Sequence, residues 1–464
     1  MRPRLLASAA AALSAAMASA ADPAPLSFFN QPPAVAAQPL EKQESAQPLP
    51  GAPQPRPAGD PAPPPVPLTP FQSPLPTLQA PMTTALPADR SLHDDHLGPW
   101  NSWWFRGGYT YSWLKNAPIA PTLLSTGSAG SGGPVLLGGP APSYGALNGL
   151  SFDGGLWFNE RHTVGMSVGF FFTEQRSVGA MYSSDATGAP LLVRPFFNAA
   201  LGSAGAQDGF IVSAPGSFTG ALTVQQGAHI DGTDINFLFN TANTKHWTTN
   251  FLAGFRYFDL DEYIAVNQYT QGINGNTIPF FGGPPVNGVI ISDRVRTRNQ
   301  FYGVQVGGDT EYRFGAMFLD LGVKAALGPN HQITEVGGQT LNAAGAGGPG
   351  GFLAVGGIPN GNIGRSTTNN FAVLADATAM LGVQISSHIR FSFGYQFIYL
   401  NNVARPAHQF VTTIDPRLVP TAVSFGGQVP SNTNLGGRGT PPFTPVDRDD
   451  FFVNTLRFLL EVQY

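Results

Sequence analysis

The chain has 464 residues, of which 11% are charged, 56 are Gly and 43 are Pro, and it contains no Cys. The charged fraction is less than half of the roughly one quarter usual in soluble globular proteins, and a mean hydropathy near zero argues against a helical membrane protein and against a charge-rich disordered chain. A net charge of −4 gives no electrostatic footprint for nucleic acid, and the lack of Cys excludes disulfide scaffolds, thiolate metal sites and Cys nucleophiles.

Residues 1–20 have the pattern of a secretory signal peptide. Arg2 and Arg4 form a positive amino-terminal region, a short apolar stretch follows, and small residues precede a cleavage site between Ala20 and Ala21. The apolar stretch is too short and too rich in Ala to span a bilayer. We therefore predict that the chain is exported.

Residues 21–99 hold about half of all the Pro, in runs such as 53–57 and 63–65. Such a segment cannot pair its backbone donors or bury a core, so we predict a disordered, partly polyproline-II linker in the periplasm. It is either a passive spacer or a tether that contacts peptidoglycan. His93 and His96 flank two Asp residues where the linker ends, but no supporting groups are evident, and we predict no metal site there.

From residue 100 onward the sequence repeatedly alternates apolar and polar residues with a period of two, which is typical of β-strands. Between residues 389 and 399 one face is largely aromatic, whereas the other carries Arg390, Ser392 and Gln396. A soluble β-sandwich also alternates, but here the apolar faces are long and aromatic and the polar faces hold few Lys and Glu. Lipid on one side and a lumen on the other would explain both features. We therefore predict an all-β fold, a closed antiparallel transmembrane β-barrel over residues 100–464.

The lengths of the connections favour the same architecture, because short and long connections alternate as periplasmic turns and extracellular loops do in outer-membrane barrels. Ten strands are predicted near 103–114, 143–159, 162–174, 217–240, 245–262, 294–313, 315–328, 366–384, 387–401 and 449–464. Five long extracellular loops are predicted at 115–142, 175–216, 263–293, 329–365 and 402–448. Twelve strands result instead if residues 210–224 make a membrane-spanning hairpin of their own.

The final strand ends in an aromatic residue at the carboxyl terminus. Its apolar face consists of Leu456, Phe458, Leu460, Val462 and Tyr464. A strand of this kind looks like the signal that the barrel-assembly machinery reads, whereas an ordinary buried edge strand would not need the terminal aromatic residue. We therefore interpret these five residues as a C-terminal assembly signal.

Thirteen charged side chains fall on the polar face of the predicted strands. They are Arg106, Asp153, Glu174, Asp234, Arg256, Asp309, Glu311, Asp320, Lys324, Asp376, Arg390, Arg457 and Glu461. Uncompensated charges in a narrow lumen are unfavourable, so these residues should form cross-strand ion pairs or line water. Because ten strands lie nearer the filled eight-stranded barrels than the open sixteen-stranded porins, a lumen plugged by ion pairs and a small aqueous pore both stay open as interpretations.

The predicted loop 175–216 contains an apolar octamer at 190–197. Apolar residues in a loop are expected to bury themselves against other surface. We hypothesise that this segment packs across the outer mouth as a lid, with Phe196 and Phe197 as anchors and Arg194 facing the opening. The alternative is a hydrophobic brace between neighbouring loops.

Several sequence blocks occur in order between residues 103 and 464. They include Trp104-Phe105-Arg106, Gln175-Arg176-Ser177, Val193-Arg194-Pro195-Phe196-Phe197, Gly254-Phe255-Arg256-Tyr257-Phe258-Asp259-Leu260 and Asn299-Gln300-Phe301-Tyr302-Gly303. In this order they resemble a planctomycete family of outer-membrane β-barrel proteins, the one catalogued as β-barrel protein seven. Ser151 departs from the pattern, since Arg is expected there in the family's second strand. The resemblance implies the fold and the location, and it implies no transported substrate.

The sequence thus predicts an outer-membrane barrel whose partners are membrane lipid, the barrel-assembly machinery and, through the linker, peptidoglycan. Its function is a porin-like narrow channel or a largely plugged barrel, or alternatively that of a structural or adhesive cell-envelope protein. A hydrolase is disfavoured, because His229, His331 and His408 have no nearby nucleophile pattern. We predict no catalytic residue, cofactor or metal, and neither a transported solute nor an oligomeric state follows from the sequence.

Overall fold

The computed structural model describes residues 103–117, 119–127, 133–139, 143–199, 206–355, 361–410, 412–425 and 447–464. The predicted cleavage site at Ala20 and Ala21 and the predicted Pro-rich linker lie outside these residues. Apart from short turns of 3-10 helix, the regular structure in these ranges is β-strand. No helix among the described residues is long and apolar enough to cross a membrane.

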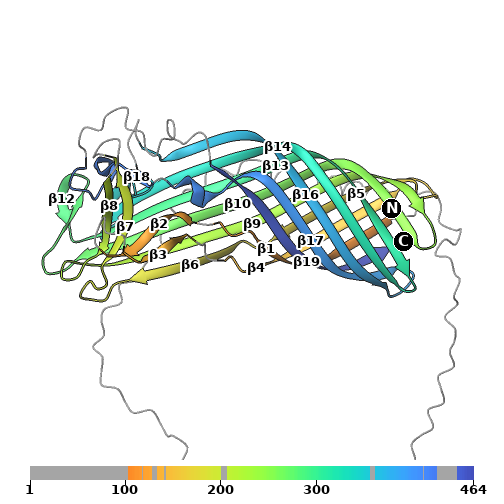
Figure 1. The fold of residues 1–464 in the computed structure, drawn as a ribbon, viewed down its shortest axis with the longest axis horizontal. Helices are drawn as coiled ribbons and strands as arrows, with labels where there is room; N and C mark the ends of the chain where they lie inside the picture. The colour runs from red at the N-terminus through yellow and green to blue at the C-terminus, as the bar shows by residue number, and fades with distance from the viewer. Residues whose placement is uncertain are drawn as a thin grey trace, which may run out of the picture. The chain divides into compact units, whose positions relative to one another are not determined.

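Ten antiparallel strands are hydrogen-bonded side by side in a ring (Figure 1). They are β1 (Trp103–Leu114), β4 (Ala146–Trp157), β5 (Val164–Thr173), β9 (Phe218–Asn243), β10 (Trp247–Gly272), β13 (Gly288–Phe314), β14 (Met317–Asn342), β16 (Gly364–Gln384), β17 (Ile389–Ala404) and β19 (Arg448–Gln463). Each pairs with the next in this order, and β19 pairs with β1, so the series returns to its start. The backbone of the ring therefore satisfies its own hydrogen bonds.

The two ends of the ring differ. At one end, here called the turn end, the strands are joined by short connections such as the two residues between β13 and β14. Gly315 occupies that turn with a φ of 69°, a conformation that residues with a Cβ adopt only with strain. Trp103 N donates a hydrogen bond to Tyr464 O over 3.1 Å, so the first and last described residues also meet at this end. The opposite end, the cap end, carries the long connections.

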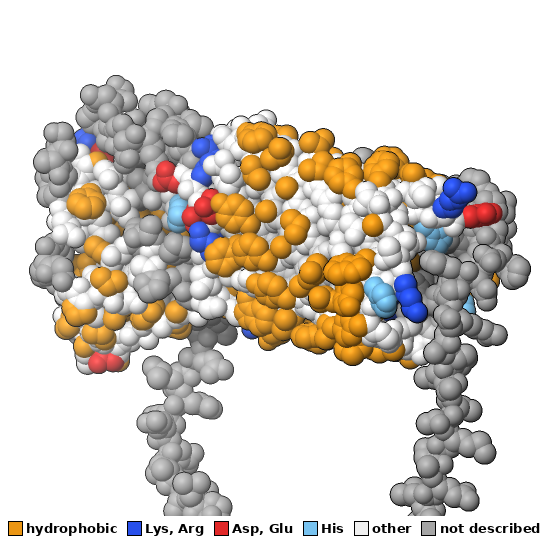
Figure 2. Space-filling model, turned by 45° about the vertical axis from the view of Figure 1, so that its right-hand side comes forward, with side chains coloured by type: hydrophobic (Ala, Val, Ile, Leu, Met, Phe, Trp, Pro, Cys, Tyr) orange, Lys and Arg blue, Asp and Glu red, His pale blue; other side chains and the backbone are white. Residues whose placement is uncertain are grey.

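Side chains alternate between the two faces of the ring. On β17, Phe393 is 43% exposed on the outer wall, whereas the next residue toward the turn end, Ser392, is 6% exposed on the inner wall. Aromatic side chains on the outer wall stack between strands, as Phe393 does on Phe458 with ring centroids 5.0 Å apart. Figure 2 shows the result, a broad band of hydrophobic side chains on the outer wall with charged side chains at both of its borders. The predicted alternation is confirmed.

The prediction of loops at 263–293 and 329–365 was wrong over much of their length, because many of these residues form β-strand. Strand β10 continues to Gly272, β13 already begins at Gly288, and β14 continues to Asn342. The period-two pattern persists in these extensions, but its apolar residues, such as Ile264 and Ile291, point inward and are buried. The strands continue because a second group of residues covers this inner apolar face.

That second group, here called the cap, folds at the cap end from the remaining connections. A five-stranded sheet contains β2 (Ile119–Thr126), β3 (Val135–Gly139), β7 (Leu192–Asn198), β8 (Ala206–Ser213) and β18 (Thr413–Ile414). Smaller elements are β6 (Arg176–Ser183), which extends along β9, the hairpin of β11 (Ile278–Phe280) and β12 (Gly283–Val286), β15 (Gly347–Pro349), η2 (Pro406–Gln409) and η3 (Pro416–Leu418). Its apolar core packs against the inner face of the extended strands.

The predicted alternative of an additional membrane-spanning hairpin at 210–224 is wrong. Residues 206–213 form β8, which pairs with β7 in the cap sheet, and residues from 218 onward already belong to β9 of the ring. The apolar residues of β8 therefore serve the core of the cap and do not extend the ring. Val212, for example, is completely buried there.

Paired substitutions test which wall of the ring meets lipid. Val323 is 65% exposed on the outer wall of β14, whereas a Cβ on its neighbour Gly322 would point inward, 3.9 Å from Asp309. Val323→Arg should reduce insertion, because an outward Arg near the bilayer midplane costs about 2–4 kcal/mol. Gly322→Arg should insert nearly as well as the native chain. Heat-modifiable gel migration after refolding into vesicles measures both, and equal damage would contradict the described faces.

Candidate functional site

Twelve of the thirteen predicted interior charges project into the ring, in the half nearest the turn end. The exception is Glu174, which follows β5 on the outside, is exposed, and lies 3.7 Å from Arg176. Its carboxylate accepts hydrogen bonds from the backbone N–H of Asn148 at 3.0 Å and from the side-chain amide of Asn148 at 2.7 Å. These bonds and the positive charge of the nearby Arg176 lower the pKa of Glu174. The prediction for Glu174 was wrong because Thr173, the last residue of β5, is buried on the inner face, so that Glu174 beside it lies on the outer face.

The charges nearest the turn end form a chain of ion pairs across the interior. Arg390 of β17 pairs with Glu311 of β13 and lies 3.3 Å from Glu461 of β19. Arg106 of β1 lies 3.9 Å from the same Glu461 and 3.5 Å from Asp320 of β14. Since β1 and β14 are separated by three strands of the ring on the nearer side, the last pair bridges the lumen and is not a contact between neighbours.

A second cluster lies farther from the turn end. Arg256 donates to Asp234 at 2.7 Å and lies 3.2 Å from Asp376, which is three strands away in the ring. Lys324 adds a contact of 3.3 Å to Asp234. Gln396 donates to Asp376 at 2.9 Å. Each buried carboxylate of the cluster thus has at least two partners, which is the condition under which buried charges are tolerated.

The remaining interior charges are paired on the wall. Arg457 of β19 donates to Asp153 of β4 at 2.8 Å and to the hydroxyl of Ser151 at 3.2 Å, so these contacts reach across β1, which lies between the two strands. Asp309 accepts a hydrogen bond of 2.8 Å from Asn250. Asn250 was not predicted as part of the site, because a single Asn in an alternating strand carries no distinctive signal.

Above the charges, toward the cap end, an apolar layer crosses the interior. It consists of Leu114, Leu147, Ala228, Ile230, Phe258, Leu260, Phe301, Ala326, Ala372, Leu374, Ile398, Leu400, Phe451 and Val453, all buried. Phe171 of β5 packs against this set, so every strand of the ring contributes to it. Phe258 meets Phe451 from a distant strand with ring centroids 6.2 Å apart. This layer was not predicted from the sequence.

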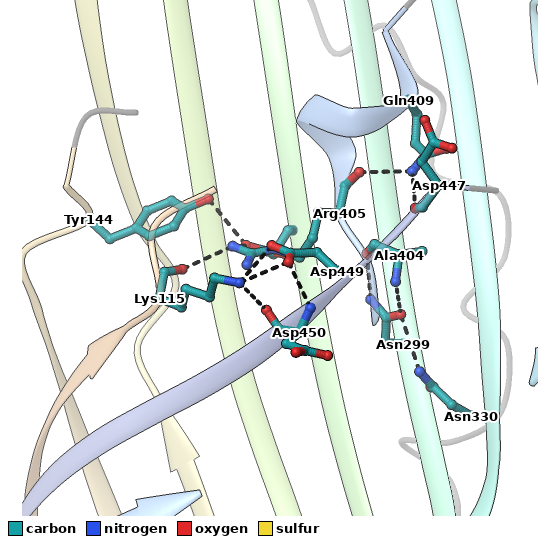
Figure 3. Close-up of polar contacts among 11 residues, drawn as sticks. Lys115, Tyr144, Asn299, Asn330, Ala404, Arg405, Gln409, Asp447, Asp449 and Asp450 are labelled. Atoms are coloured by element: carbon teal, nitrogen blue, oxygen red, sulfur yellow. Dashed lines mark hydrogen bonds and ion pairs between the residues drawn. The ribbon is translucent and has the colours of Figure 1, made fainter. Parts of the chain in front are cut away.

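One buried ion pair joins the cap to the ring (Figure 3). Arg405, just after β17, donates to both carboxylate oxygens of Glu262 of β10 at 2.6 and 2.8 Å, and both side chains are completely buried. Tyr144 donates to Glu262 at 3.3 Å, and Arg405 also donates to the carbonyl of Lys115 at 3.0 Å. Burial alone would lower the pKa of Arg405, but Glu262 holds it above its ordinary value. Burial and Glu262 together raise the pKa of Tyr144 well above its usual range.

A second buried pair corrects the lid hypothesis. Arg194 of β7 does not face an opening, because it is buried and lies 3.0 Å from Asp293 of β13. The second oxygen of Asp293 accepts the backbone N–H groups of residues 352–354 at 2.8–2.9 Å. Phe196 is an anchor, buried edge-on against Phe352 at 5.4 Å, but Phe197 points the other way and is 48% exposed. Asp293, Gln268 and the ring of Phe352 supply the contacts that a buried guanidinium requires.

The predicted assembly signal lies on the outer wall of β19, where the ring closes against β1. Phe458, Leu460, Val462 and Tyr464 are exposed there, and Leu456 is half-buried. Tyr464 stacks on Trp103 with ring centroids 6.2 Å apart. In the described ranges, no three His, Asp or Glu side chains are grouped so that they could hold a metal ion.

Comparisons with known proteins place these features in context. The model of one protein family, described as "Putative beta barrel porin-7 (BBP7)", matches residues 103–440. No curated protein matches the chain. The outer membrane protease OmpT from Escherichia coli aligns at 10% identity over 80% of this chain and 100% of that chain, with a TM-score of 0.34. A TodX deltaS2S3 mutant monoaromatic hydrocarbon channel aligns at 8% identity over 78% and 90%, with a TM-score of 0.16.

Glu262→Gln tests the buried pair that joins the cap to the ring. Removing one partner leaves Arg405 buried without a counter-charge, which costs about 3–5 kcal/mol. Segment 405–425 should then become sensitive to protease, and thermal unfolding should occur at lower temperature. The matched control is Glu335→Gln, since the pair of Glu335 with Arg365 at 3.8 Å is partly exposed and should contribute only about 0–1 kcal/mol. Equal effects of the two substitutions would contradict a dominant role for Glu262.

Proposed function

The chain belongs to the beta barrel porin-7 family, and on this premise we propose that its ring of strands is a closed, ten-stranded barrel that spans an outer membrane. The outer wall supports the proposal. On β10 the outward-facing residues from Trp247 to Tyr257 are apolar or aromatic, apart from Thr249, and a crossing strand tilted by about 45° needs about 9–11 residues. Aromatic residues at both limits of this stretch are typical of the two membrane interfaces.

The cap is proposed to lie outside the cell and the turn end in the periplasm, because short turns face the periplasm in outer-membrane barrels. The exposed aromatic face of β19, at the seam with β1, supports its recognition by the barrel-assembly machinery. The predicted linker would then begin in the periplasm, where contact with peptidoglycan is possible. We propose no catalytic role for the barrel.

The observation that best supports the proposed function is the apolar layer. A small ion that crosses the barrel would leave water at this layer, and unpaired charges in an apolar environment are strongly disfavoured. Ion pairs that bridge the lumen narrow the path further on the side of the turn end. We therefore favour a plugged barrel that anchors the folded cap at the cell surface.

A porin-like narrow channel is the second candidate. It is favoured by the side chains of Arg106, Asp320 and Lys324, which remain 22–27% exposed although they point into the ring. Water therefore reaches the charged half of the interior, and the apolar layer separates that half from the cap. A channel would require this layer to move.

Conductance in planar bilayers distinguishes the two candidates. The native protein should not conduct, and the triple variant Phe258→Ala, Phe301→Ala and Phe451→Ala should conduct, because it removes three rings from the apolar layer. The matched control Phe255→Ala, Phe393→Ala and Phe458→Ala removes three rings from the outer wall, where they are exposed, and should stay closed.

Heat-modifiable migration checks that each variant is folded. Steady conductance by the native protein would overturn the plugged barrel in favour of the channel. A folded triple variant that stays closed would show that the apolar layer is not the barrier.

A further inference from the structure

Five charged residues of β10 and β13 project outward from the ring just beyond the apolar band. They are Asp259 and Asp261 of β10 and Arg294, Arg296 and Arg298 of β13, here called the charged collar. The band ends next to them at Tyr257 and Tyr302, which face each other across the two strands with ring centroids 5.1 Å apart.

Two of the three Arg residues are already paired. Arg298 donates to Asp259 at 2.6 Å, and Arg296 donates to Asp261 at 2.9 Å. Glu335 faces Arg296 from β14, but it lies 3.8 Å from Arg365 on its other side. Asp259, Asp261 and Glu335 are therefore each paired with an Arg other than Arg294.

Arg294 has a different environment. Among the described residues, no carboxylate lies within ion-pair distance of its guanidinium, and its Nε atom is buried without a hydrogen-bond partner. The guanidinium lies over the ring of Tyr263, 4.9 Å from the centroid. Its neighbours on the two adjoining strands are Ala265 and Gly337, so small residues flank it on both sides. A charged group held in this way has donors and space for an anion.

We propose that Arg294 binds a phosphate group on the saccharide headgroup of an outer-leaflet glycolipid. The height of the site selects this occupant. Tyr263 lies opposite Arg296, six residues beyond Tyr302, which at about 3.3 Å per residue and a tilt of about 40° is roughly 15 Å above the edge of the band. The headgroup layer of a phospholipid is only about 5–8 Å thick. A phosphate carried on sugars reaches the guanidinium, whereas a phospholipid phosphate does not.

This inference rests on the proposed outer-membrane location and goes beyond it. The experiment uses the full-length protein in three kinds of vesicle, made of phospholipid alone, of phospholipid with lipopolysaccharide that has a phosphorylated inner core, and of phospholipid with the same lipopolysaccharide after dephosphorylation. Native mass spectrometry counts the glycolipid that stays bound, and heat-modifiable migration reports insertion in the same samples.

The native protein should retain the phosphorylated glycolipid, and Arg294→Gln should retain about tenfold less while inserting equally well. Arg365→Gln is the matched control, because it removes a cation that is already paired on the same wall, and it should retain glycolipid as the native protein does. Equal retention by Arg294→Gln, or equal retention of the dephosphorylated glycolipid, would overturn the proposal. Displacement by millimolar inorganic phosphate would reassign the site to free phosphate. Failure to insert in every vesicle would instead contradict the proposed location.

Discussion

Closure of the hydrogen-bonded ring is the constraint on which the rest of the structure depends. Once β19 pairs with β1, the circumference is set by ten strands, and every second side chain must point inward. In so narrow a ring the inward side chains reach the opposite wall, as Arg106 reaches Asp320. The interior is therefore filled by its own side chains, and its chemistry is set by what each strand places there.

The interior has two different fillings along the barrel axis. Ion pairs occupy the half near the turn end, and apolar side chains occupy the half near the cap. Each buried charged group needs several partners. Arg256, for example, pairs with both Asp234 and Asp376, and the three residues come from three different strands. Buried pairs of this kind contribute little net stability compared with apolar packing, but they disfavour any other register of the strands. The apolar half excludes water without requiring such matching.

The strands could be predicted from the sequence because alternation is a local signal. The first strand was predicted at 103–114 and is observed with the same bounds. Most of the interior charges could be assigned because the alternation of each strand shows which of its residues share a face. The apolar layer was missed because the alternation changes its face within a single strand. On β10 the apolar residues move from odd positions such as Phe255, which points outward, to even positions such as Phe258, which points inward, although the strand is continuous. A single sequence does not show which face of a strand is covered by other parts of the same chain.

The cap could not be predicted because its contacts join residues that are far apart in the chain. Arg194 meets Asp293 over 99 positions, and Arg405 meets Glu262 over 143. No local pattern identifies such partners. Arg194 was therefore predicted to face the opening, because an isolated charge usually lies in water. Of the two predicted anchors, Phe196 is buried and Phe197 is exposed, and the reason is local. Phe196 and Phe197 are neighbours on a strand, and only one of them can face the core of the cap.

The seam between the first and last strands also determines how the protein can fold. Trp104 is paired with Gln463, so the contacts that close the ring join residues more than 300 positions apart. Closing so long a segment is slow, because its entropy is lost before the contacts that compensate for it are formed. Until the last residues arrive, both terminal strands present unpaired backbone groups, which are prone to join other chains. A nascent chain of this kind depends on being kept apart from its copies until its carboxyl terminus is delivered.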